Sequence, residues 1–192
     1  MKQEKRLLRQ KINARIAAAS PEDRAAWSRS IVDRVLGLDC FRSAKTILGF
    51  HPLPDETDIT LLLEAVIAQG KQLYLPRVDR KTRGAMAVVR VTDLKRLAAS
   101  PLNIFEPEKG DVLTDLSKLD LVIVPGRAFD AKGRRVGRGG GYYDRLFQKL
   151  APRTKRVAVA FSCQIIDKVP REEWDAGVDV LVSEDGVITV NR

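Results

Sequence analysis

The stretch Leu121-Val122-Ile123-Val124 is an uninterrupted apolar run that precedes a segment rich in glycine and arginine. After that segment, residues 142–150 have a helical pattern, and Arg156–Phe161 forms a second apolar run. Continuous apolar strands joined through a helix are typical of a parallel sheet buried on both faces. These residues therefore predict a strand–helix–strand unit, with ligands bound at the carboxyl ends of its strands.

A second unit of this kind is expected earlier in the chain, where the apolar run Thr46–Phe50 leads through a turn-rich segment to a helical pattern at 58–69. We also expect helices at 2–18 and from the N-cap Ser20 to about residue 36, and further strands at 72–75, 85–91, 178–182 and 187–190. The fold class predicted is α/β. Residues 1–192 are expected to form one domain with a mostly parallel, Rossmann-like sheet covered by helices on both faces.

Composition narrows the classes of function. The chain has 192 residues, of which 44% are hydrophobic, enough for one core. No apolar run approaches the roughly 18 residues that span a bilayer, and the first residues are charged, so we expect no membrane segment, no secretory signal and a cytoplasmic location. One histidine and two distant cysteines argue against zinc spacing and a histidine-centred site. Any metal must be held by carboxylates and phosphate oxygens.

The positive charge is concentrated in one segment. Between Arg127 and Arg156 there are ten basic and two acidic residues, and five of the thirteen glycines lie there too. Such a local excess suggests an anionic ligand. The alternatives are a solvated basic surface and a nucleic-acid-binding face, which the net charge of +9 also motivates.

The connection at 125–141 is long for a strand-to-helix loop. Its glycines at 137 and 139–141 let the backbone approach an anion closely, and a helix start adds a positive dipole end. Arg134, Arg135 and Arg138 flank these glycines, and guanidinium groups match phosphate geometry. The pattern is neither a Walker motif nor the dinucleotide fingerprint. It predicts a phosphate-binding loop, with ATP and magnesium as the favoured ligand.

Several side chains near this loop have two interpretations. Asp144 could be an ordinary first-turn acid or a magnesium ligand. Tyr142 and Tyr143 could pack under the loop or face a site. The same choice, between a structural or solvated role and a place in the site, applies to Glu56, Lys5 and Arg9.

The chain resembles the 5-formyltetrahydrofolate cyclo-ligases, also called 5,10-methenyltetrahydrofolate synthetases. The specific match is the string from Val122 to Asp130 followed by Gly133 to Arg145, which contains GRRVGRGGGYYDR. Weaker matches cover most of the remaining chain: Lys5, Arg9, Glu56-Thr57-Asp58, Leu75–Val78, Glu106-Pro107, Gln164 and Pro170–Asp175.

The resemblance implies an enzyme that converts 5-formyltetrahydrofolate to 5,10-methenyltetrahydrofolate with ATP and Mg²⁺, releasing ADP and phosphate. The formyl oxygen would attack the γ-phosphate, and a folate nitrogen would then close the ring. Catalytic roles are implied for Glu56, Arg135, Tyr143 and Asp144. ATP binding is implied for Lys5, Arg9, Arg135, Gly137, Arg138, Gly139, Gly140, Gly141, Tyr142 and Tyr143. Folate contacts are implied for His51, Glu56 and Tyr143, and magnesium ligation for Asp144 and Asp175.

One position departs from the family pattern, because Trp174 stands where a histidine often precedes the aspartate, and this puts the local role of Asp175 in question. We expect small-molecule substrates, no nucleic acid and no membrane, and a monomer with a dimer as the alternative. Against a nucleic-acid-binding module, aromatic residues make up only 6% of the chain. A different phosphoryl-transfer or sugar-phosphate enzyme on a similar sheet is the third reading, since fold does not fix chemistry.

Overall fold

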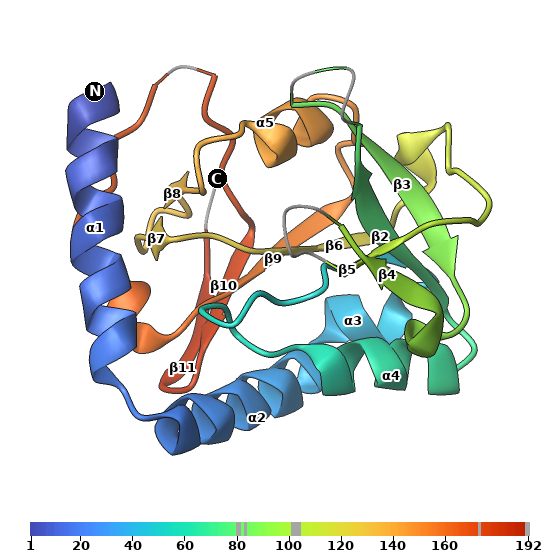
Figure 1. Cartoon of the computed structure of the whole chain (residues 1–192), viewed down its shortest axis with the longest axis horizontal. Coiled ribbons are helices and arrows are strands. Elements are labelled where there is room, and N and C mark those ends of the chain that lie inside the picture. The colour runs from blue at the N-terminus through green and yellow to red at the C-terminus, as the bar shows by residue number, and fades with distance from the viewer. Residues whose placement is uncertain (80–81, 83, 101–104, 173, 191–192) are drawn as a thin grey trace.

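The largest sheet of the protein has seven strands in the order β11-β10-β9-β6-β1-β2-β3 (Figure 1). The computed structural model describes residues 1–79, 82, 84–100, 105–172 and 174–190, so Glu173 of the matched stretch 170–175 lies outside it. The five strands from β10 to β2 run parallel, while β3 and β11 add antiparallel edges. The predicted α/β fold with a mostly parallel sheet is confirmed.

The strands of this sheet are β1 (Thr46–Leu48), β2 (Gln72–Val78), β3 (Met86–Val91), β6 (Leu121–Val124), β9 (Lys155–Val159), β10 (Val180–Ser183) and β11 (Gly186–Thr189). Two short antiparallel pairs join β4 (Leu97–Ala99) to β5 (Phe105–Pro107) and β7 (Ala128–Phe129) to β8 (Arg135–Val136). The helices are α1 (Lys2–Ala18), α2 (Pro21–Gly37), α3 (Asp39–Ser43), α4 (Thr60–Ala68) and α5 (Tyr142–Phe147). Every strand and helix that we predicted is present, although α5 ends three residues before the predicted position 150.

Alternation along the strands divides the apolar core between the two faces of the sheet. On β6, Leu121 and Ile123 belong to one buried cluster, and Val122 and Val124 belong to the other. The first cluster packs against α1 to α4, and the second packs against α5. Figure 1 shows α2, α3 and α4 on one side of the sheet and α5 on the other. All four β6 side chains are fully buried, and each contributes on the order of 2 kcal/mol to folding.

The first two helices follow local sequence signals. The Ser20 hydroxyl accepts a hydrogen bond of 3.0 Å from the Asp23 amide, and Pro21 occupies the first helical position of α2. On α1 the buried residues are Lys5, Ile12 and Ile16, whose spacing places them on one face. That face is therefore apolar near the end of the helix and cationic near its start.

The composition also raised the questions of membrane spans and thiols. Among the residues that the structure describes, none of the helices combines the length and apolar character that crossing a bilayer requires.

Cys40 and Cys163 are free, half-buried thiols, and burial raises the pKa of both. Neither thiol is expected to be reactive at neutral pH.

The strand order reverses between β1 and β6. From β1 the chain moves outward to β2 and β3, and it then returns to place β6 on the other side of β1. The loops that follow two such strands leave the sheet in opposite directions and open a crevice at the carboxyl ends. The segments after Leu48 and Val124 are these loops, and they carry most of the residues singled out in the sequence.

The hairpin of β7 and β8 shapes the first part of the loop after β6. It is fastened by Asp130, a fully buried carboxylate that accepts hydrogen bonds from the Arg134 side chain at 2.6 Å and from the Val169 amide at 2.8 Å. Its tight turn needs Gly133, because φ is +72° there and a Cβ would lie 2.5 Å from the Val178 carbonyl oxygen. The sequence did not reveal this hairpin.

We predict that Asp130→Ala lowers the free energy of unfolding by about 3 kcal/mol, because it leaves the Arg134 guanidinium, the buried Val169 amide and two partly buried amides without their acceptor. Urea denaturation measures the change. Asp167→Asn, at an exposed acid nearby in the fold, is the control and should change stability by less than about 0.5 kcal/mol. Equal stability of the two variants would contradict the role given to Asp130.

Candidate active site

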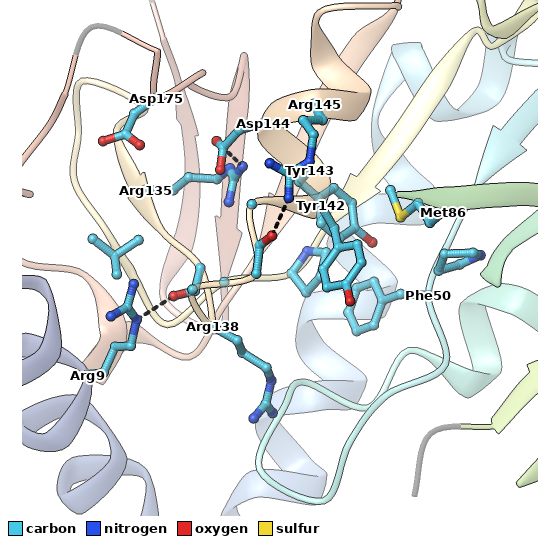
Figure 2. A pocket seen from close by; sticks show the side chains of 18 of the residues that line it. Arg9, Phe50, Met86, Arg135, Arg138, Tyr142, Tyr143, Asp144, Arg145 and Asp175 are labelled. Carbon is cyan, nitrogen blue, oxygen red and sulfur yellow. Dashed lines mark hydrogen bonds and ion pairs between the residues drawn. The ribbon is translucent and has the colours of Figure 1, made fainter. Parts of the chain in front are cut away.

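A cavity of about 870 Å³ opens at the carboxyl ends of β1 and β6. Its walls come from parts of the chain that are distant in sequence, among them the start of α1, the loop after β1, the strands β2, β3 and β5, the loop between β8 and α5, and Glu172, Trp174 and Asp175. Figure 2 shows Arg9 and Asp175 toward one end, and Phe50 and Met86 toward the other. The cavity thus has a charged end and an apolar end, with the glycine loop between them.

The glycine loop 137–141 is fixed by arginines that bond to its carbonyl groups. Arg9 donates from Nε to the Gly137 oxygen at 2.7 Å, and Arg145 donates to the Gly140 oxygen at 2.6 Å (Figure 2). Gly139 and Gly141 have φ values of +105° and +68°, which favour glycine. A loop that is held through its carbonyl oxygens, and in which four of the five residues lack a side chain, can bring backbone amides close to an anion.

The ammonium group of Lys5 sits in a nearly buried position, with the residue 9% exposed, and bonds to two carboxylates. Its Nζ lies 2.8 Å from Glu172 Oε2 and 2.5 Å from Asp175 Oδ2. Burial alone would lower the pKa of Lys5, but its hydrogen bonds and its attraction to Asp175 and Glu172 outweigh burial and raise it. Lys5 is therefore a fixed positive charge at the charged end of the cavity.

Arg135 contributes a second buried cation. Its side chain is 4% exposed and donates to Asp144 Oδ1 at 2.6 Å, and its guanidinium lies 5.2 Å from the centre of the Phe147 ring. Burial lowers the pKa of Arg135, and it outweighs the charges of Asp144 and Asp175, which raise it. Its Nε is buried and has no hydrogen-bond partner among the described residues. A phosphate oxygen is the kind of group that would satisfy this N–H.

Arg138 connects the glycine loop to the loop after β1. Its Nε donates to Glu56 Oε1 at 2.9 Å, and its terminal nitrogen pairs with Asp55, which also pairs with the buried Arg127. Burial alone would raise the pKa of Asp55, but the two arginines outweigh this and lower it. Glu56 also accepts a hydrogen bond of 3.1 Å from the Leu53 amide, so its carboxylate is held in place at the cavity wall.

The apolar end of the cavity is built from Phe50, Met86 and Phe105, with the His51 ring 5.0 Å from that of Phe105. Burial lowers the pKa of His51, which favours its neutral form at neutral pH. The Tyr143 hydroxyl, which is buried as well, has no hydrogen-bond partner in the described parts of the chain. Burial raises the pKa of Tyr143, so the group stays protonated and can donate to a ligand.

The structure also bears on the choice of metal. Among described residues, no group of three or more histidines, cysteines, aspartates or glutamates could hold a metal ion. Asp144 and Asp175 nevertheless line the same cavity and both act on the pKa of Arg135. One or two carboxylates completed by phosphate oxygens and water suit Mg²⁺. The donor set therefore fits a magnesium ion that arrives with a nucleotide.

The structure places every residue predicted for the site on the wall of this one cavity. They are Lys5, Arg9, His51, Glu56, Arg135, Gly137, Arg138, Gly139, Gly140, Gly141, Tyr142, Tyr143, Asp144 and Asp175. The interpretation of Lys5 as part of a solvated helix face is wrong, because it is nearly buried. The individual roles in binding and catalysis stay predictions.

Sequence reasoning missed other residues at the site. Asp55 carries no signal that separates it from other acids, and Glu172 lies in the matched stretch 170–175 but had no predicted role. Folding brings Asp55 to Arg138 and Glu172 to Lys5. The apolar wall at Phe50 could have been suspected from its place just after a predicted strand. The basic excess of the segment 127–156 is partly balanced within the chain, since several of its arginines are paired with acids: Arg127, Arg134, Arg135, Arg138 and Arg156.

Comparisons with known proteins identify the family of the chain. Residues 1–184 match the sequence model of the 5-formyltetrahydrofolate cyclo-ligase family. The mouse 5-formyltetrahydrofolate cyclo-ligase is 33% identical over 94% of each chain, and the Escherichia coli K12 protein of that name is 33% identical over 90% of this chain and 96% of its own. The solved structure of Aquifex aeolicus 5,10-methenyltetrahydrofolate synthetase superimposes with a TM-score of 0.85 at 33% identity, covering 98% of this chain and 93% of that one. The chain therefore belongs to the 5-formyltetrahydrofolate cyclo-ligase family of enzymes.

Proposed function

We propose that this enzyme converts 5-formyltetrahydrofolate to 5,10-methenyltetrahydrofolate, with ATP and Mg²⁺ as co-substrate and metal, and releases ADP and phosphate. The observation that carries the proposal is the order of features along the cavity. An apolar wall suited to a pterin ring and a cluster of buried cations suited to a triphosphate lie on either side of the glycine loop. The γ-phosphate and the formyl group would meet at that loop.

The reaction has two steps, and in each of them one bond between heavy atoms forms and one breaks. The formyl oxygen attacks the γ-phosphorus, the bond from that phosphorus to the ADP oxygen breaks, and a phosphorylated imine forms. The neighbouring folate nitrogen then attacks the imine carbon, loses its proton, and phosphate leaves. Positioning and charge stabilisation are what such a reaction asks of a protein. Lys5 and Arg135, both nearly buried, would stabilise the negative charge on the phosphoryl oxygens.

The ion pairs of the cavity suit a nucleotide that carries magnesium. Lys5 is paired with Asp175, and Arg135 is paired with Asp144. A triphosphate alone would take the cations and leave two carboxylates unpaired at the cavity wall, which is costly. A bound Mg²⁺ supplies positive charge to the phosphates, and Asp144 and Asp175 would hold it. The magnesium nucleotide thus offers a partner to both members of each ion pair.

At the apolar end, Glu56 and Tyr143 would contact the folate. A pterin presents adjacent N–H donors on its ring edge, and a carboxylate can accept two such bonds. The carboxylate of Glu56 lines the cavity and is already oriented by Leu53 and Arg138. The Tyr143 hydroxyl would donate to a ligand acceptor, and His51 would pack beside the ring in its neutral form.

The direct test is to mix the protein with 5-formyltetrahydrofolate, ATP and Mg²⁺ and to follow the absorbance of the methenyl product. We expect the product to accumulate in proportion to ADP released, with no product when ATP or Mg²⁺ is left out. The purified protein with all three components and no methenyl absorbance would refute the proposal.

We predict that Asp144→Asn lowers kcat on the order of a hundredfold, because the amide can still accept from Arg135 but cannot hold Mg²⁺ as a carboxylate does. Circular dichroism should show an unchanged fold. The control is Asp39→Asn, an exposed acid on α3 outside the cavity, which should keep full activity. Turnover in Asp144→Asn equal to that control would remove Asp144 from the mechanism.

We predict that Tyr143→Phe raises KM for the folate roughly fivefold without loss of stability, because the hydroxyl has no partner in the described structure to lose. The free energy of unfolding, from urea titration, should change by less than about 0.5 kcal/mol. The ring contacts with Arg135 and Phe147 remain in the variant. A clear loss of stability with an unchanged KM would show that the hydroxyl is structural.

A further inference from the structure

Trp174 is the feature of the cavity that the proposed function leaves unexplained. Among the described residues, two large aromatic side chains are exposed: Phe105 has 45% of its surface exposed and Trp174 has 63%. Both line the cavity. Phe105 stacks near His51 at the apolar end, where the pterin is proposed to bind. Trp174 instead directly precedes Asp175, and Asp175 lies at the charged end of the cavity (Figure 2).

The turn that carries Trp174 is held in place. The Glu172 amide donates to Asp175 Oδ2 at 2.8 Å, and the Asp175 amide donates to the Glu172 carbonyl at 3.0 Å. Lys5 bonds to the side chains of both acids and ties the turn to α1. Glu172 and Asp175, near the indole in sequence, are therefore held in place, and Trp174 is not among the described side chains that pack against the core.

The orientation of the triphosphate in the cavity determines which part of a ligand would lie against this indole. If the γ-phosphate faces the pterin across the glycine loop, the remaining phosphates and the nucleoside extend away from the apolar wall. Lys5, Asp175 and Trp174 all line the cavity, Lys5 bonds to Asp175, and Trp174 is the neighbour of Asp175 in sequence, so the nucleoside would lie near the indole.

Resting on the proposed function, we infer that Trp174 is the stacking platform for the nucleotide base. Nucleobases stack on aromatic side chains through their π-faces with little dependence on base identity. The tryptophan at this position would thus add affinity for the nucleoside and none for the phosphates. Binding of ATP and of GTP should depend on it to a similar degree.

Calorimetry on Trp174→Ala tests the inference with two probes, ATP and inorganic tripolyphosphate, each with Mg²⁺. We expect the Kd for ATP to rise about tenfold, the Kd for tripolyphosphate to stay the same, and Trp174→Phe to recover most of the loss. Equal changes for both probes, or none, would overturn the inference. A loss confined to folate binding would overturn it too, by placing the folate tail on the indole.

Fluorescence provides an independent readout, because the chain has two tryptophans and Trp27 lies away from the cavity against Phe161. In Trp27→Phe, ATP should quench the emission of Trp174, and tripolyphosphate should not. If Trp27→Phe unfolds the chain, the calorimetric comparison of Trp174→Ala with the unaltered protein, both of which keep Trp27, tests the stacking. Failure of the unaltered protein to bind either probe would refute the nucleotide site itself, whereas binding of both without a Trp174 effect would refute only the stacking.

Discussion

The site depends on the pairing of buried cations with carboxylates across segments that are far apart in sequence. Lys5 on the first helix bonds to Glu172 and Asp175, and Arg135 bonds to Asp144. An unpaired charge at such positions would be expensive, so each member of a pair holds the other in place. Under the proposed function, a ligand that draws the cations away must also offer a partner to the carboxylates. A magnesium nucleotide carries both signs of charge and meets this requirement.

The parallel sheet determines where these groups meet. The order in which successive strands are added to the sheet reverses between β1 and β6, and the loops after these two strands leave the sheet in opposite directions. One loop brings Glu56 and Phe50, the other brings the β7–β8 hairpin and the glycine loop, and Met86 on β3 and Phe105 on β5 complete the apolar wall. Arg138 joins the two loops through Asp55 and Glu56. The buried apolar strands thus determine where the cavity lies, and the loops supply its charged and polar groups.

Much of this could be predicted from local sequence. The apolar run 121–124 indicates a buried strand, and glycines beside arginines indicate a phosphate loop, because these signals lie within a few residues. The partners of Lys5 could not be predicted, since they are 167 and 170 positions away. The β7–β8 hairpin was missed because each strand has two residues, too few to show a period. The burial of Tyr143 likewise depends on packing by Phe147 and neighbouring elements.

The exchange of ion pairs is the central claim, and a crystal structure of the protein with Mg²⁺ and a non-hydrolysable ATP analogue tests it most directly. We expect the triphosphate along residues 137–141, with Lys5 and Arg135 bonded to phosphate oxygens and the metal bound by Asp144 and Asp175. A nucleotide bound elsewhere, with the Lys5–Asp175 and Arg135–Asp144 pairs unchanged, would contradict the account.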